Sequence, residues 1–179
     1  MTVADVVRHA GIARNTFYEN FGSKQDCFLE TQQFAMSAAL ERVVEAAGEC
    51  GEWSCQVEAG LAAFLRYVAE EPALARVCIV DALGAAPGSV QYYEESLQVF
   101  VSLLRLGRDV CPHGRELPKS LEEAVVGGVF WILYQRLLVD APERIEELLP
   151  ELVEFALTPY LGAEAAREAA GRDGGGTAT

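Results

Sequence analysis

Side chains suited to nucleic-acid contact gather near the N-terminus. Arg14, Asn15 and Thr16 are consecutive, and Tyr18 and Lys24 follow within the next eight positions. Arginine can pair bidentately with guanine and asparagine with adenine, whereas a tyrosine hydroxyl and a lysine ammonium can reach phosphates. The set therefore predicts base-edge contacts from the first three residues and phosphate contacts from the other two.

A short helix precedes these residues. Thr2 and Asp5 have the spacing of a capping box, and apolar residues at helical spacing follow them, which predicts a helix to about His9. Gly11 tolerates the left-handed backbone conformation of a turn and is expected to end this helix.

A second short helix would carry the polar set. It is expected from about Arg14 to Asn20, with Phe17 and Phe21 four positions apart and facing inward, which leaves the polar residues exposed. Ala13 stands at the capping position, where its lack of a side-chain acceptor costs this helix about 1 kcal/mol. Asn15 or Thr16 would cap it instead. The two segments together predict a helix-turn-helix.

The order of residues in this pair has a counterpart in a known family. The residues concerned are Ala10, Gly11, Ile12, Thr16, Phe17, Tyr18, Phe21 and Lys24. Their order resembles the DNA-binding signature of the TetR-type (tetracycline-repressor-like) transcriptional regulators. The resemblance implies phosphate contacts from Thr2, Tyr18 and Lys24, and base contacts from Arg14, Asn15 and Thr16.

In that family a complete apolar helix comes before the pair, whereas this chain begins at Met1, immediately ahead of Thr2. The resemblance therefore implies a DNA-binding domain, residues 1–24, that lacks its first helix. A unit of two helices buries little apolar area, so we expect it to hold its shape poorly by itself.

The charge of the chain is uneven. The whole sequence carries a formal net charge of −13, which opposes DNA binding because affinity for DNA comes largely from neutralising phosphates. Residues 1–24 contain three arginine or lysine residues and two carboxylates, a balance of +1, so the remaining residues carry −14. DNA would be repelled least by the N-terminal segment.

The remaining sequence predicts an all-α fold. It has 51% hydrophobic residues and no alternating apolar and polar run that would favour a strand. A helix from Lys24 to about Glu49 would be about 40 Å long at about 1.5 Å per residue. Gly, Pro and Ser punctuation predicts further helices at 54–71, 72–83, 89–110, 120–139 and from the turn at 140–142 to 161. Residues 25–162 would form an effector-binding and dimerisation domain, and 163–179 a flexible tail that extends helically at its start.

The middle helices contain an unusual supply of aromatic residues. Rings with a few hydroxyl groups and an indole N–H are the composition of an apolar pocket with few polar groups. The family resemblance implies a ligand chamber in this region, although plain core packing is the alternative for each ring. The ligand-binding candidates are Phe64, Tyr67, Tyr92, Phe100, Trp131 and Tyr134.

The last two long helices have more apolar surface than one chain needs to bury. The resemblance implies that they pair with their copies in a homodimer, as a four-helix interface. The alternative is that they close the core of a single chain. The interface candidates are Val125, Gly128, Leu148, Leu152 and Phe155.

Five cysteines, an odd number, in a chain without a secretory signal favour a reduced, cytoplasmic protein over a disulfide framework. A zinc site made of Cys50, Cys55, Cys111 and His113 is an alternative, but the spacing is not the usual close pairing, so we predict no metal and no cofactor. No run reaches the roughly 18 apolar residues that a membrane-spanning helix needs. The two histidines belong to no catalytic arrangement, so we predict no enzymatic activity.

The sequence thus predicts a ligand-responsive transcriptional regulator, and the resemblance favours a repressor. It would bind a palindromic double-stranded DNA operator as a homodimer, and a small apolar or aromatic effector would release it by displacing the long helix that starts at Lys24. The alternative is a dimeric helical ligand-binding or interaction module without effective DNA binding.

Overall fold

The computed structural model describes residues 2–82, 86, 88–139 and 144–171. All regular structure within these residues is helical, which confirms the predicted all-α class. Most of the loop predicted at 84–88, the turn predicted at 140–142 and residues 172–179 of the predicted tail lie outside the described residues.

The N-terminal helix pair consists of α1 (Val3–Ala10) and α2 (Arg14–Asn20). The capping box is formed as predicted, because the Thr2 hydroxyl accepts from the Asp5 N–H and the Asp5 carboxylate accepts from the Thr2 N–H. Gly11 ends α1 with a φ of 66°, a conformation that a side chain would strain. The pair is therefore set by local sequence.

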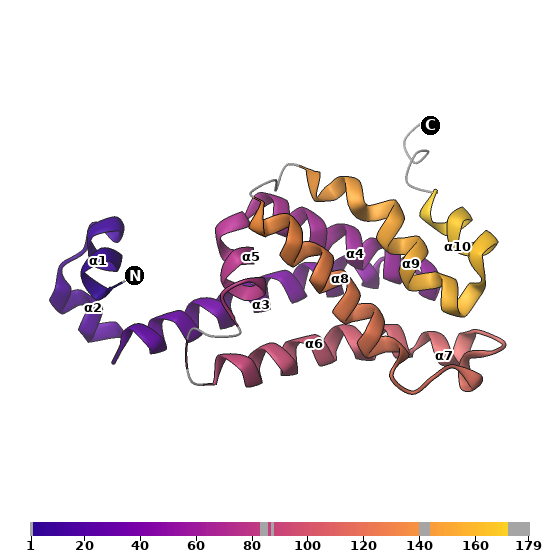
Figure 1. Ribbon diagram of the computed structural model, residues 1–179, viewed down its shortest axis with the longest axis horizontal. Coiled ribbons are helices and arrows are strands. Elements are labelled where there is room, and N and C mark those ends of the chain that lie inside the picture. The colour runs from indigo at the N-terminus through magenta and orange to yellow at the C-terminus, as the bar shows by residue number, and fades with distance from the viewer. Residues whose placement is uncertain (1, 83–85, 87, 140–143, 172–179) are drawn as a thin grey trace.

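The long helix α3 (Lys24–Gly48) follows, and the Ser23 hydroxyl caps it by accepting from the Asp26 N–H at 3.1 Å. Its 25 residues correspond to about 37 Å at about 1.5 Å per residue. Figure 1 shows the N-terminal pair at one end of α3 and the remaining helices packed around its other end. This second part, whose inner face is buried at Gln32, Ala35, Met36, Ala39 and Val43, joins the pair to the body of the protein.

The body contains seven further α-helices among the described residues. They are α4 (Trp53–Glu70), α5 (Pro72–Ile79), α6 (Ser89–Arg105), α7 (Gly107–Val110), α8 (Leu121–Leu138), α9 (Leu149–Leu161) and α10 (Ala163–Ala170). The single helix predicted at 89–110 is divided into α6 and α7. Gly107 stands at the break, and a side chain there would overlap the ring of Trp53, so this close approach occurs only with glycine.

Two other boundaries differ from the prediction. The last long helix begins at Leu149, with Pro150 in its first turn, where a missing backbone N–H costs nothing. The segment predicted as a tail from residue 163 begins with α10, which packs on α9 and buries Ala166 and Ala169. Small alanine side chains allow the two helices to approach closely, so the packed body extends to Ala170.

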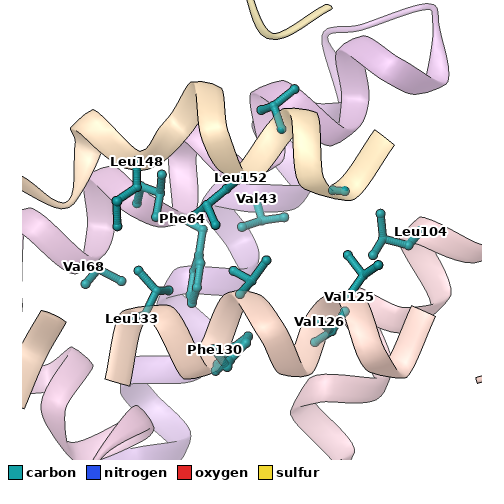
Figure 2. Packing of buried hydrophobic residues seen from close by; sticks show 14 of the residues in the cluster. Val43, Phe64, Val68, Leu104, Val125, Val126, Phe130, Leu133, Leu148 and Leu152 are labelled. Carbon is teal, nitrogen blue, oxygen red and sulfur yellow. The ribbon is translucent and has the colours of Figure 1, made fainter. Parts of the chain in front are cut away.

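The core lies between α3, α4, α8 and α9. Figure 2 shows Leu133 of α8 and Leu152 of α9 pointing toward Phe64 of α4. α4 packs along α3 and also against α9, while α8 packs against α6. Because α3 forms one wall of this core, a change inside the core can reach the N-terminal pair through a continuous helix.

A buried ion pair fixes one end of the body. The Glu122 carboxylate is 0% exposed and accepts from Arg108 Nε at 2.6 Å, Arg108 Nη2 at 2.9 Å and the Tyr160 hydroxyl at 2.8 Å. Burial alone would raise the pKa of Glu122, but these hydrogen bonds hold it below its ordinary value. The network joins α7, α8 and α9.

Cys50 and Cys55 are joined by a disulfide bond, so the expectation that all five cysteines are reduced is wrong for this pair. Sequence spacing could not show that the turn after α3 brings their Cα atoms within 5.7 Å. Cys27, Cys78 and Cys111 are free thiols.

Within the described ranges, no group of three or more possible ligands could hold a metal ion. No helix in the described part of the chain has the length and apolar character needed to cross a membrane.

Candidate nucleic-acid interface and effector cavity

The exposed face of α2 presents the predicted base-facing residues. Arg14, Asn15 and Thr16 are exposed, whereas Phe17 between them and Tyr18 is buried. The buried ring packs edge-on against Tyr18 and tilted against Phe21, both with ring centroids 5.3 Å apart. Phe17 therefore anchors the helix while the polar residues remain accessible to a ligand as large as a DNA duplex.

Tyr18 and Arg14 are adjacent on this face. The Arg14 guanidinium carbon lies 5.6 Å from the centroid of the Tyr18 ring, which restricts both side chains. Tyr18 is exposed, so its hydroxyl can reach a phosphate. Lys24 is the first residue of α3 and lies just beyond the end of α2. The predicted phosphate contacts thus bracket the C-terminal part of α2.

Thr2 is engaged within the chain. Its hydroxyl and its backbone N–H both donate to the Asp5 carboxylate at 2.8 Å, so a phosphate contact from Thr2 requires one of these bonds to open. The bond from the Thr2 N–H is the main reason why the pKa of Asp5 is lowered, followed by the bond from its hydroxyl. Arg8 pairs with the same carboxylate at 2.7 Å. Thr2 and Asp5 therefore both serve the N-terminal cap of α1.

The main cavity of the body has a volume of about 80 Å³. A single water needs only about 10–15 Å³ on this scale, so the space suits a larger guest. Its walls come from α3, α4, α6, α8 and α9 and are almost entirely apolar. Lining residues include Val43, Trp53, Gln56, Phe64, Phe100 and Phe130.

Three phenylalanine rings form an aromatic cluster at this cavity. The centroid of Phe64 lies 5.2 Å from that of Phe100 and 5.5 Å from that of Phe130, and the last two lie 5.6 Å apart. The side-chain N–H groups of Trp53 and Gln56 in the wall already have partners, because Trp53 Nε1 donates to the Leu103 carbonyl and Gln56 Nε2 donates to the Cys50 carbonyl. The cavity therefore favours a guest without charge.

The predicted ligand-binding set is divided by the structure. Phe64 and Phe100 line the main cavity, and Tyr67 lines a smaller one of about 10 Å³, together with Phe64. Tyr92 lies outside both, with its hydroxyl donating to the Gln33 carbonyl of α3.

Trp131 and Tyr134 also lie outside the main cavity. Trp131 is exposed, Tyr134 is partly buried against the core, and the two rings stack on each other with centroids 5.5 Å apart. Trp53 and Phe130 line the cavity but were missed by the prediction. Trp53 begins α4 one residue before the predicted start, and Phe130 alternates with Trp131 on a helix that is apolar on all sides, so the sequence did not show which ring faces inward.

The predicted dimer residues are divided as well. Val125, Leu148 and Leu152 are buried in the core of one chain, so they are corrected from interface to core residues. Gly128 and Phe155 lie against each other on the outside, where a Cβ at Gly128 would come within 3.1 Å of the Phe155 ring. The core buries one side of α8 and α9, whereas apolar residues on their other side are exposed.

An apolar surface remains on that exposed side. It is formed by Gly127, Trp131, Leu138 and Phe155, and we refer to it as the α8/α9 outer face. Trp131 is 61% exposed and Phe155 is 44% exposed. The three residues of α8 follow each other at intervals of four and seven, which places them along one side of the helix. Gly127 has no atom within 4 Å of a Cβ built on it, so a partner helix could approach closely there.

Comparison with known proteins bears on the N-terminal pair. Residues 1–31 match the family model described as bacterial regulatory proteins, tetR family. This range includes α1, α2 and the first turns of α3, and with them all the residues predicted to contact DNA. Neither the curated proteins nor the solved structures gave a match to the chain.

Proposed function

On the match of residues 1–31 to the tetR family model, we propose that this chain is a TetR-type regulator that binds a palindromic operator as a homodimer and is released by a small effector. Regulators of this type bind DNA, control transcription and are not enzymes. We take repression as the working mode and the cytoplasm as its place of action.

The observation that carries the proposal is that three consecutive polar residues of α2 are exposed. Arg14, Asn15 and Thr16 stand exposed above the buried Phe17, within the segment that matches the family. A helix of this kind can enter a major groove with its first residues at base edges. Tyr18 and Lys24 would then hold the helix to the phosphates on either side.

Gel-shift titration on the palindrome upstream of the gene tests this assignment. We expect Tyr18→Phe and Lys24→Ala to weaken binding on every sequence alike. Because a dimer has two copies of each contact, Lys24→Ala should reduce the slope of log K against log salt by about 2, whereas Tyr18→Phe, which removes a neutral hydroxyl, should leave the slope unchanged. Lys119→Ala is the matched control, since it removes the other lysine of the chain, an exposed residue of the body. If both variants bound the DNA as tightly as the wild type, the assignment of Tyr18 and Lys24 as phosphate contacts would be wrong.

The effector proposal rests on the cavity. Its aromatic cluster and apolar walls favour a neutral apolar or aromatic molecule, because a charged group placed there would lose its hydration without a partner. Phe64 and Phe100 are the ligand-binding candidates that remain from the sequence, and Trp53 and Phe130 join them.

α3 can connect the cavity to the DNA-binding pair. Val43 and Ala47 of α3 line the cavity, and the same helix begins at Lys24. An effector that displaces this wall would change the separation of the two pairs in a dimer, which must match half-sites about 34 Å apart. Such coupling requires that the effector bind one arrangement of α3 more tightly than the other.

Cavity filling tests the effector site. The neutral fluorescent probe N-phenyl-1-naphthylamine should bind the wild-type protein, and Val57→Phe should weaken this binding at least about tenfold by occupying the space. Val99→Phe provides the control, because Val99 is an exposed residue of α6 that does not line the cavity. Equal binding by all three proteins would place the probe elsewhere.

The second candidate is a dimeric ligand-binding or interaction module without effective DNA binding. It is favoured by the weak anchoring of the N-terminal pair, in which α1 has no buried residue and Phe17 is the buried residue of α2. Probe binding without a gel shift on the upstream palindrome would select this candidate.

A further inference from the structure

The disulfide between Cys50 and Cys55 lies at the junction of α3 and α4. Cys50 comes two residues after the end of α3, and Cys55 is the third residue of α4. Both residues are only partly buried, so small molecules in solution can reach them. Since α3 begins at the N-terminal pair, this junction is at the opposite end of the helix that connects the pair to the body (Figure 1).

The bonded segment forms part of the cavity wall. Trp53 lies between the two cysteines in sequence and lines the cavity, as does Gln56, whose Nε2 donates to the Cys50 carbonyl at 3.1 Å. Trp53 is held on its other side by the ring of Tyr160, with centroids 4.8 Å apart. A change in the freedom of residues 50–55 therefore acts directly on two lining side chains.

The position of Cys55 favours its reaction as a thiolate. The first N–H groups of α4 lack a side-chain cap at Glu52, and a thiolate in the first turn is stabilised by these groups and by the helix dipole. The other three thiols are in the opposite situation. Burial raises the pKa of Cys78 to about 12 and also raises the pKa of Cys27 and Cys111.

We propose that Cys50 and Cys55 are a reversible oxidation site, through which a hydroperoxide changes the wall of the effector cavity. The proposal rests on the proposed function in one respect, namely that the cavity binds the effector. Where a DNA-binding regulator works, thiols are kept reduced, and the disulfides that form there are usually transient and redox-sensing.

The chemistry balances with hydrogen peroxide as the oxidant. The Cys55 thiolate attacks one peroxide oxygen, the O–O bond breaks, and the leaving hydroxide takes a proton to become water, which leaves Cys55 as a sulfenic acid. The Cys50 thiol then attacks this sulfur, the S–S bond forms, the S–O bond breaks and a second water leaves. Two thiols are oxidised and one peroxide is reduced to two waters, and a dithiol reductant reverses the change.

The bond restricts the segment that carries Trp53. In the oxidised protein the end of α3 and the first turn of α4 are fixed to each other, so Trp53 and Gln56 hold their places in the wall. After reduction the six residues from Cys50 to Cys55 gain freedom, and both side chains can shift. Oxidation thereby alters how tightly the cavity holds a guest.

The test uses the full chain with Trp131→Phe, which leaves Trp53 as its single tryptophan. The protein is reduced, freed of reductant and titrated with hydrogen peroxide, and the remaining thiols are alkylated under denaturing conditions and mapped by mass spectrometry. We expect the loss of two alkylatable thiols, a cross-link between the peptides of Cys50 and Cys55, and a shift of Trp53 emission that dithiothreitol reverses. Cys27→Ser should behave like the parent protein, and Cys55→Ser should lose the cross-link and the shift of Trp53 emission.

Two results would overturn the proposal. One is oxidation of Cys27 or another thiol before the Cys50 and Cys55 pair. The other is formation of the cross-link without a change in Trp53 emission. In Cys50→Ser the reaction should stop at the sulfenic acid, which dimedone traps on Cys55, and absence of this adduct would contradict the order of steps.

Binding of N-phenyl-1-naphthylamine separates this inference from the proposed function. We expect its affinity to differ at least about threefold between the oxidised and reduced proteins, and equal affinities would overturn the link to the cavity. A probe that binds neither form counts against the effector proposal, whereas the mass and Trp53 measurements still decide whether the pair is a switch.

Discussion

The dimer proposal makes its sharpest prediction at Trp131. This side chain is 61% exposed and its ring stacks on Tyr134, so removing it should cost the single chain little. A tryptophan can bury up to about 250 Å², so about 150 Å² remains to be covered by a partner. At about 25 cal/mol per Å², and allowing for the alanine that stays, Trp131→Ala removes about 3 kcal/mol per subunit. The two copies in a dimer give an upper figure of about 6 kcal/mol.

Only part of such an area term reaches the measured affinity, so we expect the dimer dissociation constant of Trp131→Ala to rise at least about 100-fold. Sedimentation velocity over a concentration series measures this change, and the melting temperature of the diluted protein checks that the fold is retained. Phe34→Ala is the matched control, because Phe34 is an aromatic residue of α3 that is 68% exposed and lies outside the α8/α9 outer face. The reasoning is refuted if Trp131→Ala dimerises as tightly as the wild type, or if Phe34→Ala dissociates equally.

Three further predictions concern stability. Glu122→Gln leaves Arg108 without its carboxylate and should lower the free energy of unfolding by about 3 kcal/mol in a urea titration; an unchanged midpoint would contradict the importance of this pair. Because the pKa of Glu122 is lowered in the folded protein, its contribution is complete above the ordinary glutamate pKa of about 4.3 and is lost as pH falls below it, so the wild type should lose its advantage over Glu122→Gln in acid melts. Gly127→Ala should stabilise the monomeric Trp131→Ala protein by up to about 1 kcal/mol, and Gly128→Ala by less, since the Phe155 ring at 3.1 Å must move; equal gains would contradict this packing.

Only some of the residues that line the cavity could be predicted from the sequence. The sequence predicted Phe64 and Phe100 as ligand-binding candidates because aromatic rings with a few polar groups are the composition of an apolar pocket and because the family resemblance implies a ligand chamber, and both line the cavity. The sequence predicted Trp131, and not Phe130, as a ligand-binding residue. In the structure Phe130 lines the cavity and Trp131 is exposed. α8 is apolar on nearly every side, so its sequence has no polar stripe that would show which side faces the core.

The same limit applied to the dimer candidates. Val125, Leu148 and Leu152 are apolar residues at helical spacing, which is equally typical of a core and of an interface. They are buried because α4 packs against α9 and its Phe64 side chain fills the space between α8 and α9. The buried bonds of Glu122 with Arg108 and Tyr160 also join residues far apart in the chain, and nothing in their spacing predicted them.

The sequence by itself determined the features that depend on near neighbours along the chain. The capping box of Thr2 and Asp5, the left-handed turn at Gly11 and the exposed polar residues on α2 all follow from contacts within a few residues, and they predicted the helix-turn-helix. The tertiary structure decided which rings face the cavity, which side of α8 remains free and that Cys50 meets Cys55. These depend on where distant helices pack, because burial is shared among several elements and no single segment specifies it.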